Sequence, residues 1–143
     1  MQKKQILVIN GPNLNMLGKR NKDYYGTKTL NDIYQMMEEI GDFDYSFFQS
    51  NHEGAIIDRI QELNYDAIII NAGAYTHTSI AIHDALEIFN GPKVEVHLSD
   101  VDNREDFRKV NFIRSVCSYT ITNMKEQGYI EAIKYLQKYF GMI

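Results

Sequence analysis

Five short apolar runs, separated by segments of helical periodicity, constrain the fold of this chain more than any other sequence feature. Each run is four to six residues long and rich in β-branched or aromatic side chains, which is typical of strands in a parallel sheet covered on both faces. The runs cover residues 5–10, 44–49, 66–71, 93–98 and 119–122. Strands connected through helices form parallel, right-handed βαβ units, so the pattern predicts one parallel sheet.

The segments between these runs carry apolar residues three or four positions apart, which is the spacing of one helix face. Thr29 is a suitable N-cap for the first of these helices. The predicted helices cover residues 30–40, 56–63, 78–89, 104–113 and 129–140. Together the pattern predicts an α/β fold with three layers and an open, parallel five-stranded sheet of flavodoxin-like order 2-1-3-4-5.

The size of the chain fits one compact domain over residues 1–143. With 44% hydrophobic and 24% charged residues, it has the balance of a globular protein. The net charge of −4 argues against broad binding to nucleic acids or anionic membranes. The single Cys117 excludes an intramolecular disulfide and a cysteine zinc site.

The hydropathy of the chain favours neither membrane insertion nor secretion. No apolar run approaches the roughly 20 residues of a membrane-spanning helix. Residues 1–5 lead straight into the first predicted strand, without the apolar stretch of a signal peptide. We therefore expect a cytoplasmic protein with no membrane and no nucleic-acid partner.

Asparagine, histidine and serine residues are found where three of the predicted strands end. Asn13 follows the first strand, Asn71 and His77 follow the third, and His97 and Ser99 close the fourth. Ligands of open α/β sheets bind beyond the carboxyl ends of the strands. These five residues, distant in sequence, therefore predict a binding site at one edge of the sheet.

Each of these residues also has a purely structural interpretation. Asn13 and Asn71 are suited to closing turns, and His77 to capping or packing against the following helix. His97 has the stronger functional case, because Glu95 lies two residues earlier on the same side of the strand. A carboxylate there fixes the imidazole tautomer. The alternative is a surface pair on the strand.

The stretch from Gly11 to Lys28 is longer than the usual connection of about 2–6 residues between a strand and a helix, and long loops here often act as lids. It contains Arg20, Tyr24 and Tyr25. A phenol is a poor base at neutral pH, but a guanidinium close to it favours the phenolate. The alternative interpretation is a solvated, mobile loop.

Two further arginines stand four residues apart, at Arg104 and Arg108. If this segment is helical they share a face, and with Arg20 they form a cationic wall in an acidic protein. The alternative is a solvated charged face alongside Glu105 and Asp106.

Several common site motifs are absent from the sequence. There is no dinucleotide-binding G-x-G-x-x-G after the first strand and no phosphate-binding G-x-x-x-x-G-K-[ST]. There is also no H-E-x-x-H or carboxylate cluster for a metal. Asn10 and Asn71 stand where a phosphate-accepting signalling domain needs acidic residues. A flavin or phosphosignal module and an inactive structural relative are the competing interpretations.

Five segments resemble the signature of type II 3-dehydroquinate dehydratases, in the same order and over nearly the whole chain. They are residues 9–18, 71–79, 95–99, 104–108 and 127–129. The resemblance implies a flavodoxin-like hydro-lyase that interconverts 3-dehydroquinate and 3-dehydroshikimate through an enolate, in the shikimate pathway of aromatic amino-acid biosynthesis. It further implies no metal or organic cofactor and a homododecamer built of trimers.

By the same resemblance, the residues of the proton transfers are assigned. Tyr25 is the base, on a lid of about residues 19–26, and directly precedes Gly26 as the family tyrosine does, with Tyr24 as the adjacent alternative. The remaining catalytic roles are Arg20 as activator of the tyrosine, His97 as the acid held by Glu95, and Asn13 at the enolate.

The resemblance also assigns the residues that bind the substrate. The backbone N–H groups of Leu98 and Ser99 hold its carboxylate, and Asp84 reaches the site of a neighbouring subunit. The side chains that bind substrate hydroxyls are Asn71, His77 and Arg108. The sequence departs from the family pattern at three places, which are His83, Asp100 and residues 123–126, where the family is usually glycine-rich.

Overall fold

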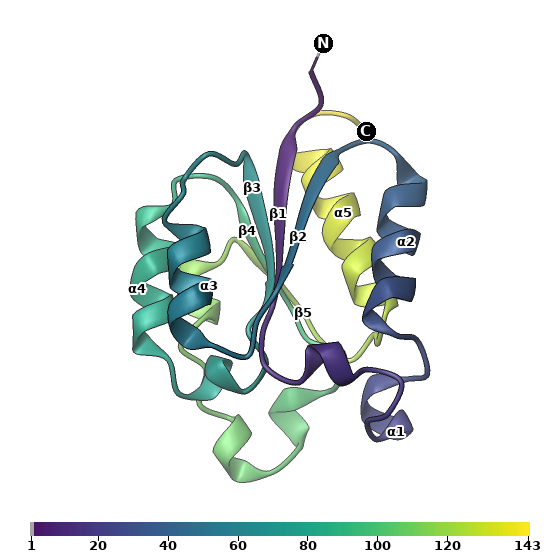
Figure 1. Ribbon diagram of the computed structural model, residues 1–143, viewed down its shortest axis with the longest axis vertical. Helices are drawn as coiled ribbons and strands as arrows, with labels where there is room; N and C mark the ends of the chain where they lie inside the picture. Colours follow the sequence, from purple (N-terminus) through teal and green to yellow (C-terminus); the bar gives the residue numbers. More distant parts are fainter. Residues whose placement is uncertain (1) are drawn as a thin grey trace.

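The computed structural model describes residues 2–143 and contains one five-stranded sheet (Figure 1). All strand pairs are parallel and their order is β2-β1-β3-β4-β5, which confirms the predicted topology. The strands are β1 (Gln5–Asn10), β2 (Asp44–Gln49), β3 (Ala67–Asn71), β4 (Lys93–Val96) and β5 (Tyr119–Ile121). Three of them are one or two residues shorter than predicted, at one end.

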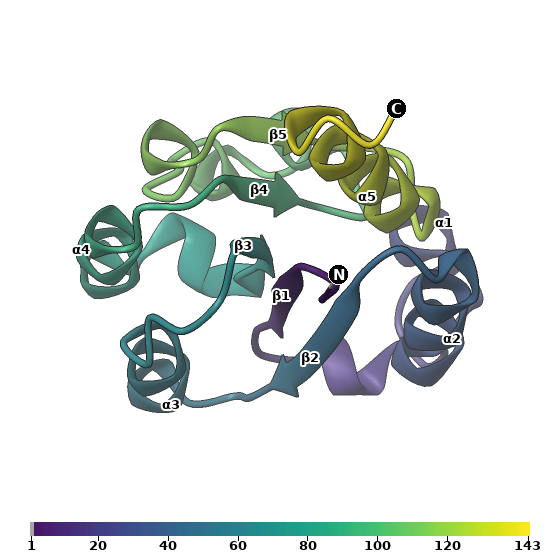
Figure 2. The same ribbon diagram turned by 90° about the horizontal axis from the view of Figure 1, so that it is seen from above.

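Helices cover both faces of the sheet and complete the three layers (Figure 2). The helices are α1 (Lys22–Tyr25), α2 (Leu30–Ile40), α3 (Glu53–Ile60), α4 (Ile80–Ile88) and α5 (Gln127–Tyr139). Helices α2 and α5 lie on one face, and α3 and α4 lie on the other. None of the helices in residues 2–143 has the length and apolar character that crossing a membrane requires.

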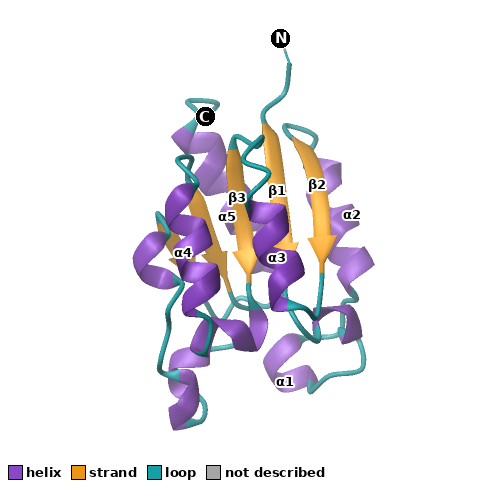
Figure 3. Cartoon of the chain, turned by 60° about the vertical axis from the view of Figure 1, so that its left-hand side comes forward, coloured by secondary structure: helices purple, strands orange, loops and turns teal. Residues whose placement is uncertain are grey.

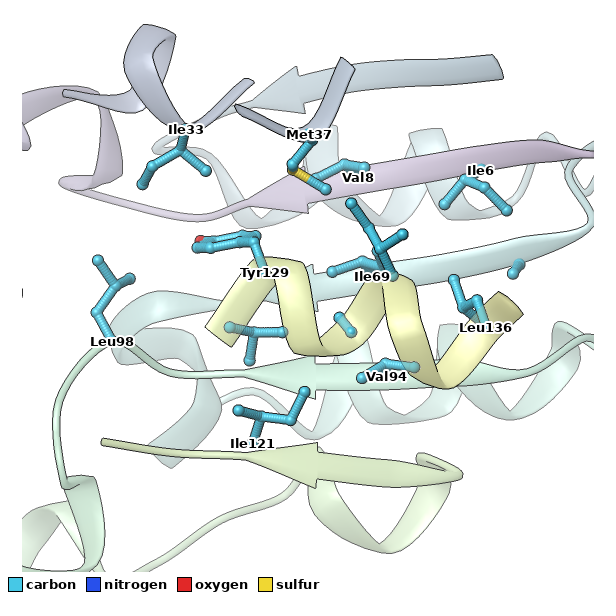
Figure 4. Close-up of a cluster of buried hydrophobic side chains, with 14 of the residues drawn as sticks. Ile6, Val8, Ile33, Met37, Ile69, Val94, Leu98, Ile121, Tyr129 and Leu136 are labelled. Carbon is cyan, nitrogen blue, oxygen red and sulfur yellow. The ribbon is translucent and has the colours of Figure 1, made fainter. Parts of the chain in front are cut away.

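Two apolar cores separate these layers because successive strand residues point to opposite faces. Ile6 and Val8 of β1 pack toward α2 and α5, whereas Leu7 and Ile9 pack toward α3 and α4. Figure 4 shows the first core, in which Ile69 of β3 lies between β1 and α5. The central strands are buried on both sides, which explains their continuous apolar sequence.

The connection from β1 to α2 contains two short helical turns, so it is more ordered than the irregular loop that the sequence predicts. A 3-10 turn covers Leu14–Met16, and α1 covers Lys22–Tyr25. Thr29 caps α2 as predicted, in a reciprocal capping box with Asp32. Figure 3 shows α1 beyond the carboxyl ends of the strands.

The prediction of a helix over residues 104–113 is wrong. The segment after β4 contains three 3-10 turns, at Val101–Asn103, Asp106–Arg108 and Arg114–Val116. The side chain of Asn111 accepts the backbone N–H groups of Ile113 and Arg114 at 2.8 and 2.9 Å. Such local side-chain bonds compete with helix formation, and the chain folds as a loop over the carboxyl end of the sheet.

The turn after β5 is where the sequence departs from the glycine-rich family pattern, and its backbone remains bent as glycine would allow. Asn123 and Lys125 adopt φ values of 62° and 51°. Their N–H groups donate to the carbonyls of Ser99 and Leu98, respectively, at 3.0 and 2.9 Å. These bonds brace the segment after β4 against the turn.

We expect the buried Ile69 side chain of β3 to contribute strongly to stability. Ile69→Val should cost about 0.5–1.5 kcal/mol and Ile69→Ala about 2–5 kcal/mol of unfolding free energy, because the truncation leaves a cavity. Ile143→Ala, at a side chain that is 77% exposed, should change it by less than about 0.5 kcal/mol. Denaturant unfolding of the three variants measures this, and equal losses would contradict the packing described.

Candidate active site

A pocket lies at the carboxyl ends of β1, β3 and β4, where the sequence predicts a site. About 530 Å³ of space there is free of protein atoms, part of it open to solvent. The lining is polar and contains three arginines and two histidines. The lining residues are Pro12, Asn13, Leu14, Arg20, Tyr25, Asn71, Gly73, Ala74, His77, His97, Leu98, Ser99, Val101, Arg104 and Arg108.

Tyr25 is held in the pocket by two arginines, each in a different way. Nη1 of Arg104 donates to the Tyr25 hydroxyl at 2.7 Å and to Ser99 Oγ at 3.2 Å. The guanidinium of Arg20 instead lies 3.7 Å from the centroid of the Tyr25 ring. Burial lowers the pKa of Arg20, the nearby Tyr25 raises it, and the charges of Arg104 and Arg108 lower it further.

Tyr24 is placed differently from its neighbour. Its side chain is exposed, and its ring lies 4.0 Å from the guanidinium carbon of Arg104 and edge-on to the ring of Tyr25. Tyr24 does not line the pocket, whereas Tyr25 does. Of the two adjacent tyrosines, Tyr25 is therefore the one that reaches the pocket.

His97 and Glu95 form a buried pair at the end of β4. Nε2 of His97 lies 2.5 Å from Oε2 of Glu95, and both side chains are less than 5% exposed, which excludes the surface-pair alternative. Burial alone raises the pKa of Glu95, but the bonds from His97, Asn111 and Thr120 outweigh it and lower that pKa to about 2. Glu95 is therefore an anion at neutral pH, and it orients the imidazole that lines the pocket.

His77 is fixed by the backbone of the loop after β4. Its Nδ1 lies 2.7 Å from the carbonyl oxygen of Val110, so Nδ1 carries a proton and donates it. Burial lowers the pKa of His77, and that carbonyl partly offsets the effect. His77 thus meets the loop rather than the following helix.

Asn13 and Asn71 close turns and also line the pocket, so their structural role leaves them at the predicted site. Asn13 adopts a left-handed φ of 69°. The Oδ1 atom of Asn71 accepts the N–H of Gly73 at 3.1 Å. Both turns present polar groups at the edge of the sheet, beside the paired ends of β1 and β3.

A buried hydrogen-bond chain fixes the asparagines that end β1 and β3. Nδ2 of Asn71 donates to the Tyr129 hydroxyl at 3.2 Å, and that hydroxyl donates to Oδ1 of Asn10 at 2.5 Å. Nδ2 of Asn10 lies 3.3 Å from the Tyr34 hydroxyl. Because Gly73 N–H can only donate, the orientation of the Asn71 amide is determined, and with it the direction of the chain.

Leu98, Ser99 and Arg108 also line the pocket, and Asp84, which is predicted to reach the site of a neighbouring subunit, does not. Asp84 is an exposed residue of α4, and its Oδ1 lies 3.0 Å from Nδ1 of His83. With Glu87 these residues form the grouping of three metal-type ligands found among residues 2–143. Their carboxylates are exposed on the helix, and none of them lines the pocket.

Known proteins resemble this chain over nearly its whole length. The profile of the family described as "Dehydroquinase class II" matches residues 4–137. The chain belongs to the class II dehydroquinase family. The 3-dehydroquinate dehydratase of Thermotoga petrophila is 48% identical over 137 residues, covering 94% of this chain and 95% of the relative. That of Clostridium beijerinckii is 51% identical, covering 93% and 95%.

Solved structures of class II dehydroquinases have the same fold as this chain. The type II dehydroquinase of Butyrivibrio crossotus superposes with a TM-score of 0.91 at 46% identity, covering 94% of this chain and 98% of that one. That of Propionibacterium acnes gives a TM-score of 0.86 at 35% identity, covering 96% and 98%.

Two contacts of this dehydroquinase-family site were not foreseen from the sequence. Arg104 was placed in a cationic wall, but its bond to the Tyr25 hydroxyl was not predicted. Asn111 donates to Glu95 at 2.7 Å and was not singled out at all. The asparagine follows the matched 104–108 segment by three residues, and only the fold of that loop brings it to β4.

We expect Tyr129→Phe to lower the unfolding free energy by about 1–3 kcal/mol, because it leaves buried polar atoms of Asn71 and Asn10 without partners. Tyr139→Phe on the same helix is the control, since that side chain is 57% exposed and should change little. Thermal and denaturant unfolding of both variants measures the difference. Equal stability of the two would contradict the hydrogen-bond chain.

Proposed function

We propose that this chain is a 3-dehydroquinate dehydratase that eliminates water from 3-dehydroquinate to give 3-dehydroshikimate. The observation that carries the proposal is the pocket in which Tyr25 and His97 are each held by a charged partner, in a chain of the class II dehydroquinase family. The reaction needs a base for the C2 proton, an acid for the C1 hydroxyl and donors for the enolate. The pocket contains a candidate for each role, with Tyr25 as the base, His97 as the acid and Asn13 as the donor.

Tyr25 is the proposed base. Its phenolate removes the proton from C2, which lies α to the C3 ketone, and the electron pair of that C–H bond passes into an enolate. Support comes from Arg104, which donates to the phenol oxygen, and from Arg20, which lies over the ring. Cations beside a phenol oxygen stabilise the negative charge that a phenolate base carries. Arg104 therefore joins Arg20 as a proposed activator.

His97 is the proposed acid. It gives a proton to the C1 hydroxyl, which leaves as water while the enolate reforms the ketone and the C1–C2 double bond forms. Support comes from the anionic Glu95, which stabilises the imidazolium and fixes its orientation. Asn13 is the proposed donor to the enolate oxygen, a role that positioned neutral donors fill well.

The remaining lining groups are proposed to bind the substrate, a small polyhydroxy ketoacid. The backbone N–H groups of Leu98 and Ser99 hold its carboxylate, and the cationic pocket favours an anion there. Asn71, His77 and Arg108 bind its hydroxyl groups.

Larger-scale features are proposed on the family resemblance. Residues 1–143 act as one catalytic domain, and residues 19–26 form a lid that carries Arg20 and Tyr25. Trimers assemble into a homododecamer, in which the exposed Asp84 reaches a neighbouring site. The reaction belongs to the shikimate route to aromatic amino acids, in the cytoplasm, and needs no cofactor.

Tyr25→Phe should lower kcat by at least about 100-fold, because it keeps the ring and removes the ionisable oxygen. Tyr24→Phe is the matched control and should stay within about threefold of the unchanged protein. The assay follows the ultraviolet absorbance of the conjugated product from 3-dehydroquinate. No turnover by the unchanged protein would overturn the proposed function, and a loss confined to Tyr24→Phe would move the base to Tyr24.

Borohydride added together with substrate should neither inactivate the protein nor add substrate mass to it. An imine route needs a neutral lysine in the pocket, and no lysine of residues 2–143 lines it. Lys125, after β5, is the one serious candidate for an imine-forming lysine in the sequence, and its side chain is exposed. Intact-mass analysis checks this, with an imine-forming enzyme treated in the same way as the positive control. A borohydride adduct on Lys125 with lost activity would refute direct enolate formation.

A further inference from the structure

The two histidines of the pocket are both held by neighbouring residues of one loop. His77 donates from Nδ1 to the carbonyl of Val110 at 2.7 Å. The next residue, Asn111, donates from Nδ2 to Oε2 of Glu95 at 2.7 Å, and the same oxygen meets Nε2 of His97 at 2.5 Å. Residues 110–111 therefore act on both imidazoles. Val110 contacts His77 directly, and Asn111 reaches His97 through Glu95.

The orientation of the Asn111 amide is fixed by its own backbone surroundings. Its Oδ1 accepts two N–H groups, from Ile113 at 2.8 Å and Arg114 at 2.9 Å. An N–H group can only donate, so the oxygen of the amide must face the backbone and the nitrogen must face Glu95. Asn111 is therefore a donor of defined direction at the carboxylate oxygen that His97 uses.

The other groups around this carboxylate complete its hydrogen bonds. Oε1 of Glu95 accepts the Thr120 hydroxyl at 2.8 Å and faces Nε of Arg114 at 3.4 Å. Burial raises the pKa of the Cys117 thiol, and the negative charge of the nearby Glu95 raises it further. On the pocket side, His77 is close enough to interact with the charges of both His97 and Arg108. With donors at both oxygens, Glu95 is held in one rotamer.

We propose that residues 110–111 are a positioning element that sets opposite tautomers in the two pocket histidines, with Asn111 acting on His97 through Glu95. When neutral, His77 carries its proton on Nδ1 and His97 carries its proton on Nε2. Each ring therefore keeps its other nitrogen as an acceptor. The importance of Asn111 for turnover rests on the proposed role of His97 as the acid.

The test is Asn111→Asp in the full chain. Asp keeps an oxygen for the N–H groups of Ile113 and Arg114, but it replaces the donor to Glu95 by a second carboxylate oxygen. Two carboxylates at hydrogen-bond distance compete for one proton, so Glu95 no longer faces His97 as a lone anion. The control is Asn103→Asp, because Nδ2 of Asn103 also donates to a carboxylate, Asp100, at 2.8 Å but on the surface.

Imidazole nitrogen NMR without substrate reads the positioning directly, because ring-nitrogen shifts separate protonated from unprotonated sites. We expect Nδ1-protonated His77 and Nε2-protonated His97 in the unchanged protein and in Asn103→Asp. In Asn111→Asp the His97 signals should change and those of His77 should stay. The same tautomer in both histidines of the unchanged protein would overturn the proposal, as would unchanged His97 signals in Asn111→Asp.

Kinetics supply the second readout. Asn111→Asp should lower kcat for 3-dehydroquinate at least about tenfold, with KM changed less than about threefold, and should shift the pH profile of kcat/KM. Asn103→Asp should keep the kcat and the profile of the unchanged protein. Equal effects of the two variants would contradict the positioning role. If the NMR result is as expected but neither the unchanged protein nor any variant converts 3-dehydroquinate, the proposed function is wrong and the positioning role stands.

Discussion

The buried carboxylate of Glu95 is the constraint on which the rest of the site depends. A charge that is 0% exposed is tolerated only when it is paired and fully hydrogen-bonded. Its donors come from His97 at the end of β4, Thr120 of β5, and Asn111 and Arg114 of the intervening loop. None of these parts can move alone without uncovering the charge, so the need to satisfy Glu95 makes one rigid unit of β4, β5 and the loop.

On the other side of the pocket, positive charges lie close together. Arg20, Arg104 and Arg108 converge there, although like charges at short range repel each other. Ring contacts with Tyr25 offset part of this repulsion, as does Glu105, whose single carboxylate pairs with Arg104 at 3.5 Å and with Arg108 at 3.3 Å. An anionic ligand would complete the compensation, so the arrangement is better suited to binding an anion than to stabilising the empty protein.

The strands and the edge at which the site lies were predictable from the sequence, because both follow from local patterns. An apolar run such as β3 ends at Asn71, and the carboxyl ends of parallel strands share one edge, which was enough to place His77 and His97 together. The conformation of residues 104–113 was not predictable in this way. The turn at Arg114–Val116 follows the Asn111 side chain, which also donates to Glu95, a contact that only the tertiary fold makes.

The two sides of the pocket are anchored by different kinds of contact. Leu98 and Ser99 are braced by the left-handed turn at Asn123 and Lys125, a backbone that costs energy and persists only where surrounding contacts fix it. Within α1 only Tyr25 is buried, so few apolar contacts hold that short helix. That side chain belongs to the apolar core beneath α2 and α5, and it also contacts the arginines of the pocket. The edge at Leu98 and Ser99 is therefore held by backbone hydrogen bonds, whereas α1 is attached mainly through one buried side chain.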